Sequence, residues 1–217
     1  MRRKDEGPGS KAELACIEAG AAEAWRSLKG RAEGMLQGKR LAHSLAVADE
    51  SVIMGLRFGG DPVRLALAGL VHDGAKRLDD GELIAIGEAE GLIGDPAQRE
   101  SPSLLHGPVG AWLAEHEWGI SDPVILESIR YHTTGEADMG LEACIVFMAD
   151  LVEPGRDYDG VEVLRKMCRE DLRAAMIEAI EQTFVYLERK KQPVHAGTAR
   201  CLAWLKEERG IPWTARN

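Results

Sequence analysis

Four histidines and two aspartates occur along the sequence in an order that is typical of a metal site. They are His43, the adjacent pair His72 and Asp73, and then His106, His132 and Asp150. A single His-Asp pair arises often by chance, so the evidence lies in the whole set. Imidazole and carboxylate ligands without thiolate suit iron, manganese, cobalt, nickel or zinc better than calcium. If four of these side chains share one octahedral ion, positions remain open for water and a substrate oxygen.

Basic residues stand close to this set in the sequence. Lys76 follows His72 by one helical turn. Three arginines precede or follow other members of the set by a few residues: Arg40, Arg130 and Arg156. A metal ion polarises phosphoryl oxygen and activates water, while nearby cations offset the charge that builds on phosphate. The set therefore predicts metal-assisted hydrolysis of a phosphate ester or anhydride, in which His106 and His132 hold a second ion or contact phosphate directly.

The elements that must position these side chains are all predicted to be helices. Apolar residues recur at steps of three and four, and no period-two strand pattern persists. Cap signals at Asp61-Pro62, Asp79-Asp80 and Asp122-Pro123 predict three helix starts. The predicted helices cover residues 11–31, 36–58, 62–72, 80–90, a segment that starts near 108, and then 123–132, 141–151, 161–169, 172–189 and 198–208, with a loop over 91–103.

Two of the predicted helices, 62–72 and 141–151, are apolar on all sides. A helix of this kind is buried. The first carries His72 and Asp73 at its far end, and the second carries Asp150 near its end. We therefore expect these three polar residues to lie in the centre of the protein.

Size and composition predict one all-α domain. A chain of 217 residues can form one full core, and we assign residues 1–10 to a disordered tail and residues 11–217 to a single helical domain. The net charge of -9 argues against a general binder of DNA or RNA. No apolar run reaches the roughly 20 residues of a membrane span. The four cysteines form no Cys-x-x-Cys pair, so we expect reduced thiols in a cytoplasmic protein. The sequence does not decide between a monomer and a homodimer.

The order of His43, His72-Asp73 and Asp150 resembles the HD phosphohydrolase superfamily, whose members are all-helical metal-dependent enzymes. Six segments look like the YqeK-type symmetrical hydrolases of diadenosine tetraphosphate. These segments are residues 40–43, 70–76, 104–110, 130–135, 149–157 and 192–198, and the resemblance covers about residues 36–205. It implies an HD-domain helical bundle with a buried metal site. It also implies cleavage of diadenosine tetraphosphate into two ADP. The implied metal is iron, present as one ion or as two.

The resemblance implies roles for individual residues as well. The metal ligands would be His43, His72, Asp73 and Asp150. Catalysis would rest on Asp73, Lys76, His106 and His132. Substrate contacts would come from Arg40, Gly74, Ala75, Lys76, Thr133, Arg156, Pro193, Val194, His195, Ala196, Gly197, Thr198 and Arg200. Two positions depart from the family pattern: Gly74 stands where the family often has a bulkier residue, and Ala196-Gly197 where it usually has Pro-Asp.

Three hypotheses remain open at the level of sequence. The first is an enzyme that cleaves diadenosine tetraphosphate symmetrically with metal-activated water. The second keeps this chemistry, with iron or another divalent transition metal, on a nucleoside mono- or diphosphate or a signalling nucleotide. The third is a non-catalytic regulator that binds a nucleotide. All six expected His and Asp positions are intact, which favours an enzyme with a small phosphorylated nucleotide as its partner.

Overall fold

The computed structural model describes residues 10–207 and folds them into helices, with no strand in that range. In chain order the elements are α1 (Lys11–Glu18), α2 (Ala22–Met35), α3 (Lys39–Phe58), α4 (Pro62–Val71), η1 (Gly74–Arg77), α5 (Asp80–Ala89), α6 (Ala97–Glu100), η2 (Pro102–Leu105), α7 (His106–His116), α8 (Pro123–Tyr131), α9 (Leu141–Val152), α10 (Val161–Glu170), α11 (Leu172–Lys190) and α12 (Ala196–Lys206). The predicted all-α class is confirmed.

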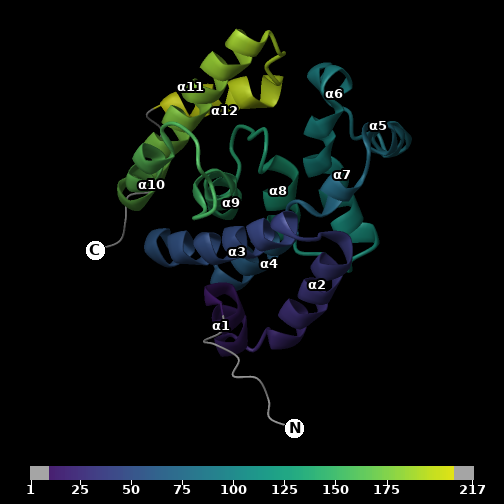
Figure 1. The fold of residues 1–217 in the computed structure, drawn as a ribbon, viewed down its shortest axis with the longest axis vertical. Helices are drawn as coiled ribbons and strands as arrows, with labels where there is room; N and C mark the ends of the chain where they lie inside the picture. The colour runs from purple at the N-terminus through teal and green to yellow at the C-terminus, as the bar shows by residue number, and fades with distance from the viewer. Residues whose placement is uncertain (1–9, 208–217) are drawn as a thin grey trace.

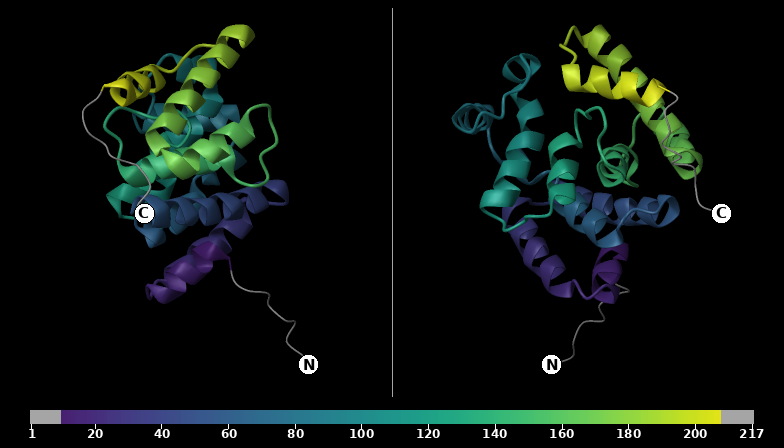
Figure 2. Two further views of the ribbon diagram at one scale, coloured as in Figure 1. Left: turned by 90° about the vertical axis from the view of Figure 1, so that its left-hand side faces the viewer. Right: turned by 180° about the vertical axis from the view of Figure 1, so that it is seen from behind.

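The helices pack around a central group that contains α4 and α9. Helices α1 and α2 lie at one end of the molecule, and α11 and α12 lie at the opposite end (Figures 1 and 2). Between them α4 packs against α3, α8 and α9. Every residue from Leu65 to Val71 in α4 and from Ala143 to Asp150 in α9 is buried. The prediction that these two helices are buried is confirmed, and they bring their polar ends into the interior.

Two glycines allow the helices that carry the histidines to approach closely. A Cβ on Gly69 of α4 would come within 2.7 Å of the Cα of Ala48 in α3. A Cβ on Gly107 of α7 would come within 2.6 Å of the carbonyl oxygen of Arg130 in α8. Real Cβ atoms do not approach backbone so closely, so a larger residue at either position would push two helices apart. Gly69 thus brings α4 against α3, and Gly107 brings α7 against α8.

The three predicted helix starts are confirmed by their caps. The side chain of Asp61 accepts backbone N–H groups at the start of α4. Asp79 and Glu82 form a reciprocal capping box at the start of α5. Asp122 caps α8 in the same way as Asp61 caps α4. Each cap satisfies N–H groups that the first turn of a helix leaves without a partner.

Several predicted boundaries are wrong. The single helix predicted over 11–31 is divided into α1 and α2 at Gly20, whose φ of 77° lies in the left-handed region. The helix predicted from residue 36 starts at Lys39, after Gly38 with a φ of 56°. The loop predicted over 91–103 contains α6 and part of η2. Ser10, which we assigned to the tail, caps α1; the rest of that tail and the predicted helix end at residue 208 lie outside the described residues.

The cysteines are free and buried, as predicted for reduced thiols. Burial raises the pKa of Cys16 to about 11 and the pKa values of Cys168 and Cys201 to about 12, so these thiols stay protonated and are poor metal ligands. Across residues 10–207, no helix has both the length and the apolar character to cross a bilayer.

Candidate metal centre

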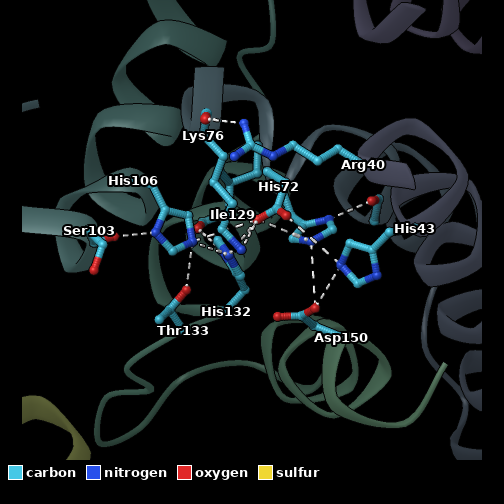
Figure 3. Close-up of polar contacts among 12 residues, drawn as sticks. Arg40, His43, His72, Lys76, Ser103, His106, Ile129, His132, Thr133 and Asp150 are labelled. Carbon is cyan, nitrogen blue, oxygen red and sulfur yellow. Dashed lines mark hydrogen bonds and ion pairs between the residues drawn. The ribbon is translucent and has the colours of Figure 1, made fainter. Parts of the chain in front are cut away.

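The six predicted histidine and aspartate side chains come together in one cluster (Figure 3). Most of them stand at helix ends: His72 caps the C-terminus of α4, His132 caps the C-terminus of α8, and His106 is the first residue of α7. Asp73 follows His72 and precedes η1. His43 is different, because it lies inside α3. Helix ends from separate parts of the chain therefore meet a single position on α3.

One carboxylate oxygen, Oδ1 of Asp73, is surrounded by three imidazoles. The Nε2 atoms of His72, His132 and His106 lie 3.4, 3.5 and 3.6 Å from it. The ammonium of Lys76 lies 2.9 Å from the same oxygen. Asp73 is only 2% exposed, so this is a buried carboxylate with several positive or polarisable neighbours.

A second carboxylate, Asp150, lies on the other side of His72. Its Oδ1 is 2.9 Å from Nε2 of His43 and 3.9 Å from Nε2 of His72. Oδ2 of Asp73 is 3.9 Å from the same nitrogen of His43. His43, His72 and Asp150 offer ligand atoms that all lie within 4.8 Å of one another, and so do His72, Asp73 and His132. His72 belongs to both groups.

Three of the histidines are oriented by backbone carbonyl groups. Nδ1 of His72 is 2.7 Å from the carbonyl oxygen of Gly69, and Nδ1 of His132 is 2.7 Å from that of Ile129. Nδ1 of His106 contacts the carbonyl oxygen of Ser103. Because a carbonyl only accepts, each Nδ1 carries the proton. In a neutral ring Nε2 then holds a lone pair, and all three lone pairs face the centre.

The remaining histidine is oriented by a side chain. Nδ1 of His43 donates to Oε1 of Glu153 at 3.1 Å. Glu153 is 3% exposed. Our sequence analysis missed this residue. The only signal was its place in the Glu153-Pro154-Gly155-Arg156 turn that follows the helix of Asp150.

Arg156 lies against Asp150 and His43. Its Nε donates to the carbonyl oxygen of Asp150 at 2.7 Å, and its Nη2 donates to Oδ1 of the same residue. Nη2 also lies 3.4 Å from Nε2 of His43. We predicted Arg156 as a substrate contact, and the structure places its guanidinium at the edge of the cluster, where its side chain is 36% exposed.

The surroundings keep both carboxylates ionised. Burial alone would raise the pKa of Asp73, but His72, His132 and Lys76 outweigh it and hold that pKa well below the usual range. Burial opposes ionisation of Asp150 as well, and His43, His72, His132 and Arg156 lower its pKa far more. Both groups remain negative at any physiological pH.

Two of the histidines are held in the neutral form. Burial lowers the pKa of His72 to about 4. Burial, together with His132 and Lys76, lowers the pKa of His106 to about 3. His43 behaves in the opposite way: burial lowers its pKa, but hydrogen bonds to Asp150 and Glu153 outweigh burial and raise it overall. Neutral imidazole is the form that binds a metal.

The cluster fits a divalent metal ion. Nε2 of His72 is buried and has no hydrogen-bond partner among the described residues. A buried lone pair without a partner costs free energy. Nε2 of His106 and Nε2 of His132 lie 2.9 Å apart, although both rings have already given Nδ1–H to a carbonyl. A cation in the cluster would give the His72 lone pair a partner and would remove the repulsion between the lone pairs of His106 and His132. The two carboxylates would balance its charge.

The predicted phosphate contacts lie beside the cluster. Nη1 of Arg40 donates to the carbonyl oxygen of Lys76 at 2.6 Å, and the Lys76 side chain is 35% exposed. Lys76 reaches Asp73 although α4 does not continue to it; the chain turns into η1 instead. The hydroxyl of Thr133 lies 2.9 Å from Nε2 of His106, the same nitrogen that faces His132.

Two residues predicted to contact substrate lie inside the fold instead. Ala75 is 0% exposed. At Gly74 a Cβ would come within 2.3 Å of the Trp118 ring, which is itself buried. The indole of Trp118 therefore fills the space that a bulkier residue at position 74 would need, which accounts for this departure from the family pattern.

The predicted nucleotide segment borders a cavity of about 210 Å³ that Thr133 also lines. Pro193, His195 and Thr198 line it together with apolar side chains such as Phe147. Nδ1 of His195 accepts the backbone N–H of Gly197 at 3.0 Å, so its Nε2 carries the proton. That Nε2 is buried and has no hydrogen-bond partner among the described residues.

The rest of this segment points away from the cavity. The N–H of Ala196 donates to Asp95 at 2.8 Å. Arg200 is ion-paired with Glu136, and a Cβ on Gly197 would lie 3.0 Å from Oε2 of Glu136. Val194 is 41% exposed. An aspartate at position 197 would therefore meet the carboxylate of Glu136, and a proline at 196 would lose the bond to Asp95.

Comparisons with known proteins agree with this geometry. Residues 40–155 match the model of the HD domain family. The chain is 37% identical over 168 residues to the "Bis(5'-nucleosyl)-tetraphosphatase, symmetrical" of Bacillus subtilis, covering 76% of this chain and 89% of that protein. The protein of the same name from Staphylococcus aureus is 36% identical, with 80% and 90% covered.

A similar fold is known from a crystal structure. It is described as a "predicted HD superfamily hydrolase involved in NAD metabolism" from Clostridium acetobutylicum. The TM-score is 0.80 at 34% sequence identity, and the match covers 83% of this chain and 96% of that one. The likeness thus extends well beyond the histidine and aspartate cluster.

Proposed function

The chain belongs to the HD domain family, and from this premise we propose that it is a metal-dependent hydrolase that cleaves diadenosine tetraphosphate symmetrically into two ADP. The observation that carries the proposal is the buried cluster itself: imidazole lone pairs converge on two ionised carboxylates, with Lys76 at its edge. The names of the similar proteins from Bacillus subtilis and Staphylococcus aureus supply the reaction.

We assign His43, His72, Asp73 and Asp150 as the ligands of the ion, and we propose iron as that ion. Other divalent transition metals accept the same donors. When bound, the ion supplies Lewis acidity to water and to a phosphoryl oxygen.

The side chains around the cluster have separate roles in the displacement. The oxygen of water bonds to a central phosphorus, the bond from that phosphorus to the bridging oxygen breaks, and one ADP leaves with the bridging oxygen. Lys76 and Arg40 offset the negative charge that builds on the phosphates. Arg156 holds the carboxylate of Asp150 and presents its exposed edge to the substrate.

His106 and His132 have two candidate roles, and their hydrogen bonds favour one of them. Each ring donates through Nδ1 to a carbonyl, so a neutral ring offers phosphate no second donor. The paired lone pairs 2.9 Å apart suit a cation instead. We therefore favour a second metal ion at these two residues over a direct phosphate contact.

We place one nucleoside of the substrate in the cavity of about 210 Å³. Thr133 lines this cavity and bonds His106, so the cavity opens beside the metal centre. The unpaired Nε2–H of His195 and the ring of Phe147 offer a base one donor and one apolar face. Serine and threonine side chains on the rest of the lining can form hydrogen bonds with the base or the sugar.

The remaining parts of the proposal concern the setting of the protein. We propose a single helical domain over residues 11–217, a cytoplasmic location and a small dinucleotide substrate rather than DNA or RNA. Buried free thiols support the location, and a net charge of -9 supports a small substrate over DNA or RNA.

The decisive experiment analyses the metal content of the full chain and then its products from diadenosine tetraphosphate by chromatography. We expect bound iron, ADP as sole product and loss of activity with a chelator. AMP together with ATP would contradict symmetric cleavage. If the metal-loaded protein cleaves nothing, other phosphorylated nucleotides are tested next; turnover of one of them would support the second hypothesis. Tight nucleotide binding without any turnover would support a regulator.

A further inference from the structure

Glu153 and His43 form a pair that differs from the other imidazole contacts of the cluster. The carboxylate of Glu153 accepts the Nδ1–H of His43 at 3.1 Å and the backbone N–H of Gly155 at 2.5 Å. It lies next to the helix that carries Asp150, 110 positions from His43 in the sequence. The contact therefore joins α3 to the turn that follows α9.

The place of His43 in its helix explains why a side chain is needed there. His72 and His132 stand at the C-terminal ends of helices, where carbonyl oxygens lack partners within the helix and are free to accept Nδ1–H. His106 starts α7 and donates to the carbonyl oxygen of Ser103 in the preceding η2. His43 is the fifth residue of α3, and the carbonyl groups around it bond N–H groups one turn further along the helix. No free carbonyl is at hand, so an acceptor has to come from elsewhere in the chain.

The turn that carries Glu153 is itself held by Arg165 of α10. Nε of Arg165 donates to the carbonyl oxygen of Val152 at 2.9 Å. Its Nη2 donates to the carbonyl oxygens of Glu153 at 2.8 Å and Arg156 at 2.7 Å. These carbonyl groups lie at the last residue of α9 and in the turn after it, where they lack helical partners. Arg165 thus fixes the backbone on both sides of the buried carboxylate.

We propose that Glu153 is a positioning residue for the metal ion: it keeps the proton of His43 on Nδ1 and turns the Nε2 lone pair toward Asp150, while Arg165 holds Glu153 in place. The inference rests on the proposed metal-dependent function. A carboxylate that accepts from a ligand histidine orients the ring and strengthens it as a donor, and loss of such a partner costs about 10- to 100-fold in metal affinity.

The first test measures the affinity of the full chain for Zn²⁺ by competition with a chelating dye. Glu153→Ala is expected to weaken binding by about 10- to 100-fold. Glu153→Gln keeps an oxygen that accepts the Nδ1–H of His43, so its loss of zinc affinity is expected to be smaller than that of Glu153→Ala. Arg165→Met is expected to weaken binding in the same direction, by less than Glu153→Ala.

A matched control separates this role from general support of the fold. Glu127 also accepts a backbone N–H, that of Gly140 at 3.0 Å, but it lies on α8 away from the cluster. Glu127→Gln should leave zinc affinity unchanged. The melting temperature of each metal-free variant shows how much stability it has lost, and the affinity loss of Glu153→Ala should exceed what that change explains.

The second test reads the ring of His43 directly. In metal-free protein with ¹⁵N-labelled histidine, held at a pH where His43 is neutral, His43→Gln identifies the His43 signals, and wild type should show a protonated Nδ1. Glu153→Ala should shift these signals toward a mixture of ring forms. Loss of stability alone would not change which nitrogen holds the proton.

Two sets of results would overturn the inference. One is wild-type zinc affinity in both Glu153→Gln and Arg165→Met, which decides the matter even if Glu153→Ala does not fold. The other is unchanged His43 signals in a folded Glu153→Ala. Neither test needs turnover, so a wild type that binds zinc in this manner but cleaves no diadenosine tetraphosphate would refute the proposed function alone.

Discussion

The two sides of the metal centre are held by different kinds of partner. His72, His106 and His132, which we call the buried half, have side chains that are at most 5% exposed and are oriented by backbone carbonyl groups. His43, Asp150 and Arg156, which we call the open half, are between 12% and 36% exposed and are held by side chains. Backbone partners remain whatever the sequence, as long as the helices end in the same place. Side-chain partners can be lost through one substitution.

Removing Asp73 should have the largest effect on the comparison, because this carboxylate touches both halves. Asp73→Ala leaves the buried lone pairs without their negative partner, so we expect loss of the ion and a fall in kcat of about a thousandfold or more. Steady-state kinetics with metal analysis checks this. Nucleotide binding should persist, because the cavity at Thr133 and His195 is separate. Turnover within a few-fold of wild type would remove Asp73 from the site.

A substitution confined to the open half should lower kcat less than Asp73→Ala does. Arg156→Met removes the donors that hold Asp150, and we expect kcat to fall by about a hundredfold at most, since one directed donor to a charged group has about that effect. Arg156→Lys should recover part of the loss. If Arg156→Met lowers activity as far as Asp73→Ala does, the open half does not differ from the buried half in the way we describe.

Acid should affect the two halves in turn. The pKa of His43 is raised, so in the metal-free protein this ring takes a proton before His72 and His106 do as pH falls, and the ion must displace that proton. We expect apparent zinc affinity to fall by up to about tenfold per pH unit below that pKa. His72 and His106, with pKa values of about 4 and about 3, should take up protons only in stronger acid. Glu153→Gln removes one cause of the raised pKa, so the onset should move to lower pH.

The smallest effects concern the packing that brings the halves together. Gly69→Ala would place a Cβ 2.7 Å from the backbone of Ala48, so we expect a loss of about 1–3 kcal/mol in the free energy of unfolding. Gly34→Ala in α2 is the matched control, because a Cβ there meets nothing within 4 Å. Alanine favours helix over glycine, so this variant should gain up to about 1 kcal/mol. Denaturant unfolding of both variants tests the contrast.

The buried half could be predicted from the sequence better than the open half could. Helix starts at Asp61 and Asp122 place His72 and His132 at the ends of the helices that follow, and the helix of His72 is apolar on all sides. The partner of each ring is then a carbonyl three residues earlier, which is local information. Glu153 could not be found in this way, because a glutamate before a proline is also typical of an exposed turn. Its role depends on α3 lying beside the end of α9, which is a long-range contact.

The division of the N-terminal segment was missed for a related reason. Apolar residues continue at helical spacing on both sides of Gly20, and one isolated glycine is tolerated within many helices. What turns the chain there is its positive φ and the packing of α1 and α2 onto α4. Neither is visible in a periodic pattern.

The Trp118 ring against Gly74 has a consequence for how this sequence can change. A side chain at position 74, next to Asp73 in the sequence, would compete with the Trp118 ring for the same space. A bulky residue introduced at 74 first would be rejected, whereas the same residue after a smaller one has arisen at 118 would be accepted. The two positions are therefore epistatic. A segment transferred from a relative with a bulky residue at 74 also requires a smaller residue at 118.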